Sequence, residues 1–140
     1  MLNKAFELAK TAHAGQMDKG GRPYINHPIA VAAMVETEEE KTVAVLHDVV
    51  EDTPVTLDEL RNHGFPESVV VAIDVLTKRL GVDYGKYIER VKQNPLALSV
   101  KIADMTHNMD LTRIKKPTDK DYARIEKYKR VLAELKIKKG

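Results

Sequence analysis

Four ionisable residues interrupt an otherwise apolar segment, and they constrain the fold more than any other feature of this sequence. The segment Val43–Asp52 reads Val-Ala-Val-Leu-His-Asp-Val-Val-Glu-Asp, so one imidazole and three carboxylates fall within His47–Asp52. Burying an unpaired charge is costly, so a buried helix carries such groups only where they have partners. Imidazole and carboxylate together are ligands of divalent transition metals. The segment therefore predicts a metal site that other parts of the chain complete.

Helical periodicity runs through the rest of the chain, and no alternating segment is long enough to predict a strand. Residues 16–24 hold two glycines and a proline, which disfavour a helix there. We expect Asn26 to be the N-cap of the second helix and Thr118 that of the last. The sequence thus predicts an all-α fold, with helices over residues 2–14, 27–34, 38–52, 57–62, 67–76, 84–92, 95–105 and 118–138.

Length and composition limit the class of protein. A chain of 140 residues suits one domain with one core, so we expect a single domain over 1–140, with its core in 2–113 and a C-terminal helix over 118–138. The net charge of +2 argues against a nucleic-acid-binding protein, which usually shows a clear basic excess. No segment has the length of a membrane span, and Met1–Lys4 lacks a signal-peptide pattern, so we expect a cytoplasmic protein without a membrane partner. The sequence leaves the oligomeric state open.

Further polar residues stand at positions that could complete a metal site. His27 begins the second predicted helix, and Asp104 lies within the apolar helix that starts at Pro95. Asn108 follows Asp104 by one turn and shares its face. The chain has no cysteine, so any metal ligands must come from histidine, carboxylate, asparagine or water.

The acidic pair after His47-Asp48 adds a catalytic possibility. Glu51 follows His47 by four residues and Asp52 follows Asp48 by four, so both acids project near the candidate ligands. Two imidazoles and two carboxylates suit a Mn-like or Fe-like ion with open positions. Such an ion promotes hydrolysis of a phosphate ester, and a nearby carboxylate can orient or deprotonate the attacking water. The residues therefore favour metal-assisted hydrolysis.

At this point the motifs carry a family resemblance. His27, His47-Asp48 and Asp104 resemble the H…HD…D signature of the HD-domain metal phosphohydrolases. The sequence is most similar to one branch, namely the hydrolase domain of RelA/SpoT-type alarmone enzymes and the stand-alone small alarmone hydrolases. The similarity covers about residues 2–113, and the segments that carry it are Gly15-Gln16, Pro23–Pro28, Leu46–Thr53, Leu76–Lys78, Lys101–Asp104 and His107–Met109.

The resemblance implies a compact HD-domain helical bundle that binds one divalent metal ion, most often Mn²⁺. It implies that the metal ligands are His27, His47, Asp48 and Asp104. Glu51 and Asp52 would be the catalytic acidic pair that positions the attacking water, while Lys19 and Asn108 would contact a nucleotide substrate. The implied reaction removes the 3′-pyrophosphate from ppGpp or pppGpp and yields pyrophosphate with GDP or GTP.

Three positions depart from the family pattern and keep other functions open. Asp18, Met105 and Asp110 stand where the family often has arginine, and a highly charged substrate needs cations. These residues favour the alternative of a nucleotide phosphomonoesterase or another nucleotide phosphohydrolase. A non-catalytic nucleotide-binding module is a third reading, but the retained Glu51-Asp52 pair argues against it.

Overall fold

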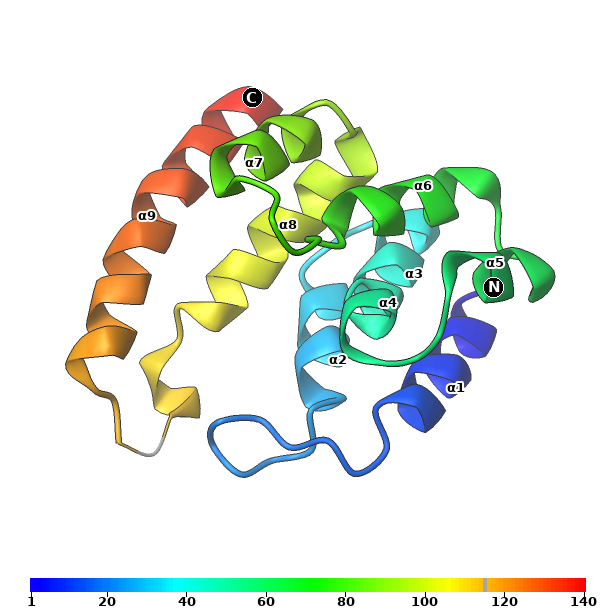
Figure 1. Ribbon diagram of the computed structural model, residues 1–140, viewed down its shortest axis with the longest axis horizontal. Helices are drawn as coiled ribbons and strands as arrows, with labels where there is room; N and C mark the ends of the chain where they lie inside the picture. The colour runs from blue at the N-terminus through cyan, green and yellow to red at the C-terminus, as the bar shows by residue number, and fades with distance from the viewer. Residues whose placement is uncertain (115) are drawn as a thin grey trace.

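The computed structural model describes residues 1–114 and 116–140, and within them it confirms the all-α prediction (Figure 1). No strand is present in this part of the chain; a single antiparallel bridge joins Met17 to Pro23 within a loop. The helices are α1 (Leu2–Ala12), α2 (Asn26–Ala33), α3 (Glu38–Leu46), α4 (Val49–Asp52), α5 (Leu57–Asn62), α6 (Glu67–Leu76), α7 (Tyr84–Lys92), α8 (Pro95–Asn108), the 3₁₀-helix η1 (Leu111–Arg113) and α9 (Asp119–Lys139).

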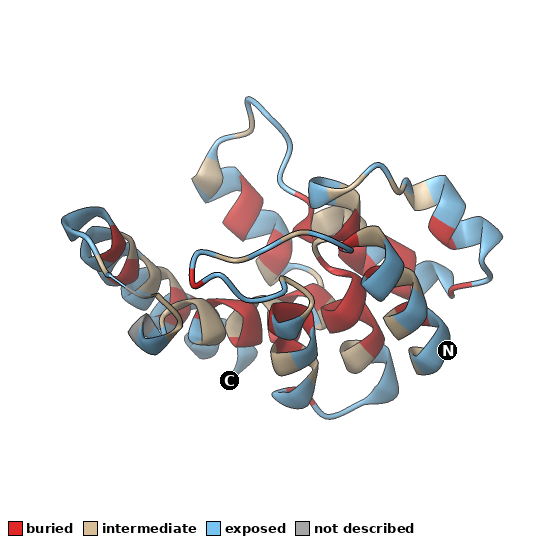
Figure 2. Ribbon diagram, turned by 90° about the horizontal axis from the view of Figure 1, so that it is seen from below, coloured by how far each residue is buried: buried red, intermediate tan, exposed pale blue. Residues whose placement is uncertain are grey.

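Helix α8 occupies the centre of the bundle. It packs against α2, α3, α6, α7 and α9, while α1 packs against α3 and α5 against α6 (Figure 1). Buried residues concentrate in the middle of the bundle, and exposed ones cover the outer faces and the loops (Figure 2). None of the described helices is long and apolar enough to cross a membrane.

Several helix boundaries agree with the sequence prediction, and side chains cap two of these helices. Helices α5, α6 and α7 have the predicted bounds, and the side chains of Thr56 and Asp83 accept hydrogen bonds from the first turns of α5 and α7. Helix α8 starts at Pro95 as predicted but continues three residues further, to Asn108. Thr118 caps α9, as expected from its position before an acidic first turn.

The predicted helix over 38–52 is wrong in one respect that matters for the site. The structure has two helices there, α3 and α4, separated by a turn at His47 and Asp48. Asp48 has φ −104° and ψ −3°, which departs from ideal helical values and interrupts the regular helix at this point. The two side chains of the dipeptide therefore sit on a turn rather than within one regular helix.

Two other helix ends differ from the prediction. Asn26 is the first residue of α2 rather than its N-cap, because Ile25 already has helical backbone angles and no side chain caps this end. Helix α1 ends at Ala12, two residues early, and the chain leaves it through Gly15 at φ +83°, a conformation that favours glycine.

The capping box at the start of α3 gives a testable contribution to stability. The Thr37 hydroxyl accepts a hydrogen bond from the Glu40 backbone N–H, and the Glu40 carboxylate accepts one from the Thr37 N–H. Thr37→Ala removes the hydroxyl acceptor and should lower the free energy of unfolding by about 1 kcal/mol in urea titrations. Thr37→Ser keeps the acceptor and is the matched control; an equal loss in both variants would contradict this role of the hydroxyl.

Candidate functional site

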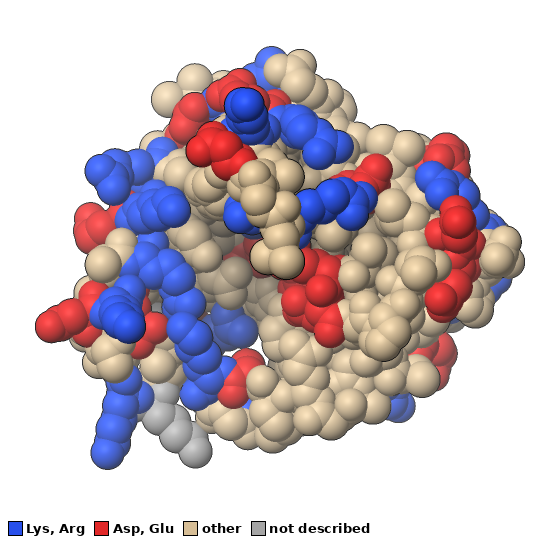
Figure 3. Space-filling model, viewed as in Figure 1, with Lys and Arg blue, Asp and Glu red and all other residues tan. Residues whose placement is uncertain are grey.

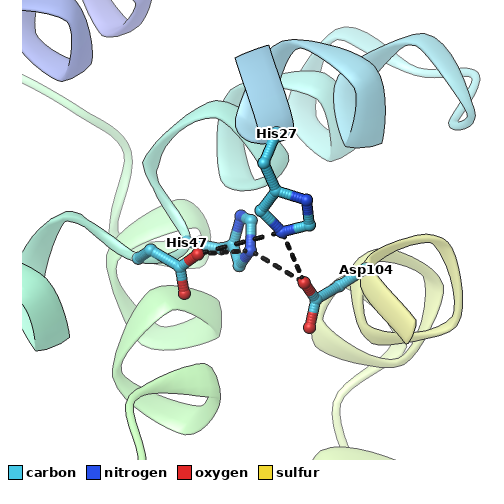
Figure 4. A group of neighbouring side chains, drawn as sticks. His27, His47 and Asp104 are labelled. Atoms are coloured by element: carbon cyan, nitrogen blue, oxygen red, sulfur yellow. Dashed lines mark hydrogen bonds and ion pairs between the residues drawn. The ribbon is translucent and has the colours of Figure 1, made fainter. Parts of the chain in front are cut away.

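Four side chains from three regions of the bundle converge on one point. They are His27 at the start of α2, His47 and Asp48 on the turn between α3 and α4, and Asp104 in α8. One nitrogen or oxygen atom from each lies within 4.8 Å of all the others. Figure 4 shows the rings of His27 and His47 and the carboxylate of Asp104 directed toward one another.

The distances within this cluster are those of groups that could share one ion. Asp104 Oδ1 lies 2.8 Å from His27 Nε2 and 3.3 Å from His47 Nε2. Asp48 Oδ2 lies 3.1 Å from His47 Nε2 and 4.0 Å from His27 Nε2. The two imidazoles are almost fully buried, with 2% and 3% of their side chains exposed. Buried imidazoles facing two carboxylates form a donor set that fits a divalent transition metal.

A second layer of contacts fixes the orientation of the two histidines. His47 Nδ1 donates to the carbonyl oxygen of Ala44, which leaves Nε2 free to face the cluster. His27 Nδ1 lies 2.7 Å from His107 Nδ1, with the two rings stacked. Burial, then Arg113 and His27, lowers the pKa of His107 to about 4, so His107 is neutral and can accept the hydrogen bond from His27. Both Nε2 atoms are therefore held as potential ligands.

The carboxylates are held in the same way. The Tyr24 hydroxyl donates to Asp48 Oδ2, and burial followed by the charge of Asp48 raises the pKa of that tyrosine. Asp104 accepts from Lys101 Nζ at 3.3 Å and from Asn108 Nδ2 at 3.1 Å. Burial alone would raise the pKa of Asp104, but Lys101 and the two histidines outweigh it and hold the pKa well below its usual range. Burial also opposes ionisation of Asp48, but His47 outweighs it and lowers the pKa of Asp48, so both carboxylates favour the ionised form.

The two acids of α4, Glu51 and Asp52, lie on different sides of the cluster. Glu51 lines a pocket together with His47, Asp48 and Asp104, and its Oε1 accepts the Lys78 backbone N–H at 2.6 Å. Desolvation, and then the charge of Asp48, raises the pKa of Glu51. The pKa of Asp52 is also raised, first by desolvation and then by Asp48, while Gln16 lowers it. Glu51 thus shares the pocket of the cluster, whereas Asp52 lies toward the loop that contains Gln16.

A larger pocket of about 240 Å³ lies beside the cluster, and we call it the cationic pocket. Both predicted substrate residues, Lys19 and Asn108, line it. Asn108 donates to Asp104 and accepts from Arg113, so it connects the cluster to this pocket. The full lining is Gln16, Met17, Asp18, Lys19, Tyr24, Asn108, Asp110, Arg113, Ile114 and Arg124. In Figure 3, lysine and arginine gather over α9, which borders a hollow in this face.

The three departures from the family pattern now have structural explanations. Asp18 Oδ1 accepts the backbone N–H groups of Gly20 and Arg22, so this acid shapes the loop over residues 16–24. Asp110 Oδ1 accepts from the backbone and hydroxyl of Thr112 at the start of η1. Met105 is buried in the core, with 1% exposed. Arg113 and Arg124 bring other cations to the pocket.

Sequence reasoning missed the residues that reach the site from a distance. Arg124 is on α9 and lines the cationic pocket only because α9 folds back along α8. Arg113 belongs to η1, which the sequence did not predict. Tyr24 lies within the motif Pro23–Pro28, and its spacing of three residues from His27 is a signal that could have placed it near the cluster.

Comparison with known proteins identifies relatives of this chain. The chain is 35% identical over 73% of its length to guanosine-3′,5′-bis(diphosphate) 3′-pyrophosphohydrolase of Haemophilus influenzae, and 33% identical over 77% to the bifunctional (p)ppGpp synthase/hydrolase SpoT of Escherichia coli. It spans 17% of the length of each.

A solved structure shares the fold. It is described as a metazoan ortholog of SpoT that hydrolyzes ppGpp, with a TM-score of 0.80 and 22% identity over 99% of this chain and 90% of that one. The family model for the HD domain matches residues 5–135, which include all four residues of the cluster. This protein therefore belongs to the HD-domain family.

Proposed function

We propose that this protein is a divalent-metal-dependent phosphohydrolase that removes the 3′-pyrophosphate from ppGpp. The observation that carries the proposal is the joining of a buried two-histidine, two-aspartate cluster to a pocket that contains Lys19, Arg113 and Arg124. The names of the relatives from Haemophilus influenzae and Escherichia coli support ppGpp as the substrate. The same reaction on pppGpp would yield GTP in place of GDP.

In this proposal one metal ion, Mn²⁺ in the first instance, is held by His27, His47, Asp48 and Asp104. A divalent ion at such a site supplies Lewis acidity, which withdraws charge from a phosphoryl oxygen and eases the ionisation of water. His107, Tyr24 and Ala44 orient the ligands before the ion arrives. This preorganisation favours one geometry of the site.

Glu51 is the group that takes a proton from the attacking water. Its carboxylate shares the pocket of the cluster, is held by the Lys78 N–H, and has a raised pKa that makes it a better proton acceptor. The water oxygen forms a bond to the phosphorus that carries O3′, and the P–O3′ bond breaks. The electron pair leaves with O3′, which takes up a proton, so one ppGpp and one water become GDP and pyrophosphate.

The nucleotide is held in the cationic pocket. Lys19 lies 3.4 Å from Asp121 and keeps more than half of its side chain exposed, so its ammonium group is accessible to a phosphate. Arg124 Nη2 lies 3.7 Å from Asp121, and its buried Nε has no hydrogen-bond partner in the described part of the chain. Asn108 lies between this pocket and the cluster, and its side-chain amide can form further hydrogen bonds to the nucleotide.

A second candidate function keeps the chemistry and changes the substrate. Asp18 and Asp110 place two carboxylates on the wall of the cationic pocket, which disfavours a substrate with two diphosphate groups. A nucleotide with fewer phosphates would meet less repulsion there. This candidate predicts that a nucleoside monophosphate is cleaved with a higher kcat/KM than ppGpp.

The deciding experiment compares these substrates directly. Purified protein is incubated with Mn²⁺ and ppGpp, and GDP and pyrophosphate are followed by ion-exchange chromatography, in parallel with nucleoside mono-, di- and triphosphates. Conversion of ppGpp to GDP and pyrophosphate at the highest kcat/KM supports the proposal. Absence of ppGpp turnover with Mn²⁺, Fe²⁺, Co²⁺ and Zn²⁺ would exclude the alarmone assignment.

Replacing Arg124 tests the cationic pocket. Arg124→Met keeps the length of the side chain but removes a charged donor, so KM for ppGpp should rise about tenfold with kcat nearly unchanged. Arg130→Met, on an exposed position of the same helix, is the matched control. Steady-state kinetics would contradict the assignment if both variants had the wild-type KM.

A further inference from the structure

The smaller pocket, in which Glu51 lies beside the cluster, also holds donors that the hydrolytic step described above does not use. Its volume is about 180 Å³, and it shares no lining residue with the cationic pocket. The cluster separates the two, because Tyr24 and Asn108 on the cationic side bind Asp48 and Asp104, which line the small pocket. The lining is His47, Asp48, Glu51, Leu76, Lys78, Tyr84, Tyr87, Lys101, Asp104 and Tyr128.

Lys101 brings a buried positive charge to this pocket. Only 16% of its side chain is exposed, and Nζ lies 3.3 Å from Asp104 Oδ2 and 5.3 Å from the centre of the Tyr87 ring. An ammonium group has three N–H donors; Asp104 accepts one of them, and the Tyr87 hydroxyl is a second acceptor close to Nζ. Buried donors without partners are costly, so the remaining N–H group favours a ligand with acceptor oxygens.

Tyr84 presents an unused hydroxyl in the same pocket. Its oxygen is buried and has no hydrogen-bond partner in residues 1–114 and 116–140. The ring is held between helices, since Lys127 Nζ on α9 lies 4.4 Å from its centre. Tyr87, by contrast, donates its hydroxyl to the Leu76 carbonyl oxygen. Tyr84 is therefore a positioned donor that is free for a ligand.

The charges in the pocket indicate which ligand it takes. Three carboxylates, Asp48, Glu51 and Asp104, face two lysines, Lys78 and Lys101, so the pocket alone does not favour an anion. A divalent cation held by the cluster would change the net charge of the pocket from negative to positive. An anion that enters should then contact the cation on one side and the donors of Lys101 and Tyr84 on the other.

We propose that this small pocket binds the 3′-pyrophosphoryl group of the substrate, which takes the water oxygen and is released as pyrophosphate, with Lys101 and Tyr84 as its donors. The proposal rests on the proposed function, because it assigns the nucleoside to the cationic pocket and the pyrophosphoryl group to the small one. The scissile bond then lies between them, at the cluster and beside Glu51.

The test measures binding of inorganic pyrophosphate and of GDP separately. Isothermal titration calorimetry is performed on Mn²⁺-loaded protein with each compound as titrant. Tyr84→Phe should weaken pyrophosphate binding about tenfold, and Lys101→Met about a hundredfold, while GDP binding by Tyr84→Phe stays at the wild-type value. Tyr122→Phe and Lys10→Met, both at exposed positions, are the matched controls.

The outcomes separate this proposal from the proposed function. Wild-type pyrophosphate affinity in Tyr84→Phe, at unchanged metal content and circular dichroism, would overturn it, as would an equal loss of GDP and pyrophosphate binding. Pyrophosphate binding that depends on Lys101 and Tyr84 supports the pocket even if ppGpp is not hydrolysed. Hydrolysis of ppGpp without that dependence would support the function and refute the pocket.

Discussion

Asp48→Asn is expected to remove the metal and to lower kcat/KM for ppGpp by about a thousandfold. Asp48 Oδ2 lies 3.1 Å from His47 Nε2, and its negative charge is half of the carboxylate charge in the cluster. An amide oxygen has nearly the same shape but no formal charge, so it binds a divalent cation weakly. A catalytic ion contributes several kcal/mol to stabilising the transition state, and about 4 kcal/mol corresponds to a thousandfold in rate.

The metal itself gives a readout that does not depend on the substrate. Atomic absorption after dialysis should find about one Mn²⁺ per wild-type chain and almost none per Asp48→Asn chain. Mn²⁺ at about a hundred times its Kd should stabilise the wild type by about 2.7 kcal/mol and leave the variant unchanged. Asp74→Asn, on the surface of α6, is the matched control. An Asp48→Asn protein with full metal content and activity would refute the ligand assignment.

Much of the fold could be predicted because local chemistry determines it. Thr56 and Thr118 cap their helices in the structure as their residue types and positions suggested. The turn at His47-Asp48 was not predictable in the same way, since Val43–Asp52 has the apolar pattern of one continuous helix. Tertiary contacts determine the backbone conformation at this turn. His47 contacts Asp104 on α8, and Asp48 accepts a hydrogen bond from Tyr24 in the loop over 16–24.

The site residues likewise fall into two groups: some could be identified from local sequence, and others depend on long-range contacts. The four candidate ligands could be named from motifs, and the structure brings all of them together. Arg113 and Arg124 could not, because their place in the cationic pocket depends on how η1 and α9 return to the loop over 16–24. Gly20 is the point of close approach, because a Cβ there would clash with the Arg113 carbonyl oxygen. Such a contact joins positions far apart in the sequence and leaves no periodic pattern.

Glu51→Gln is expected to lower kcat by about a thousandfold while the protein keeps its metal, because general base catalysis contributes roughly a hundred- to ten-thousandfold. Glutamine can still accept the Lys78 N–H, so the position of the side chain is retained and only the proton acceptor is lost. Asp52→Asn should lower kcat much less, by about tenfold. Asp52 lies toward Gln16 and does not line the pocket of the cluster.

Comparing the two variants decides which acid is the base. Single-turnover kinetics with ppGpp isolate the chemical step from product release, and metal analysis confirms that both proteins hold the ion. Glu7→Gln, exposed on α1, controls for loss of a carboxylate elsewhere. A larger loss in Asp52→Asn than in Glu51→Gln would transfer the base to Asp52 and place the attacking water on the Gln16 side of the cluster. It would also move the pyrophosphoryl group away from the Lys101–Tyr84 pocket, so the pyrophosphate titrations provide an independent check on the same assignment.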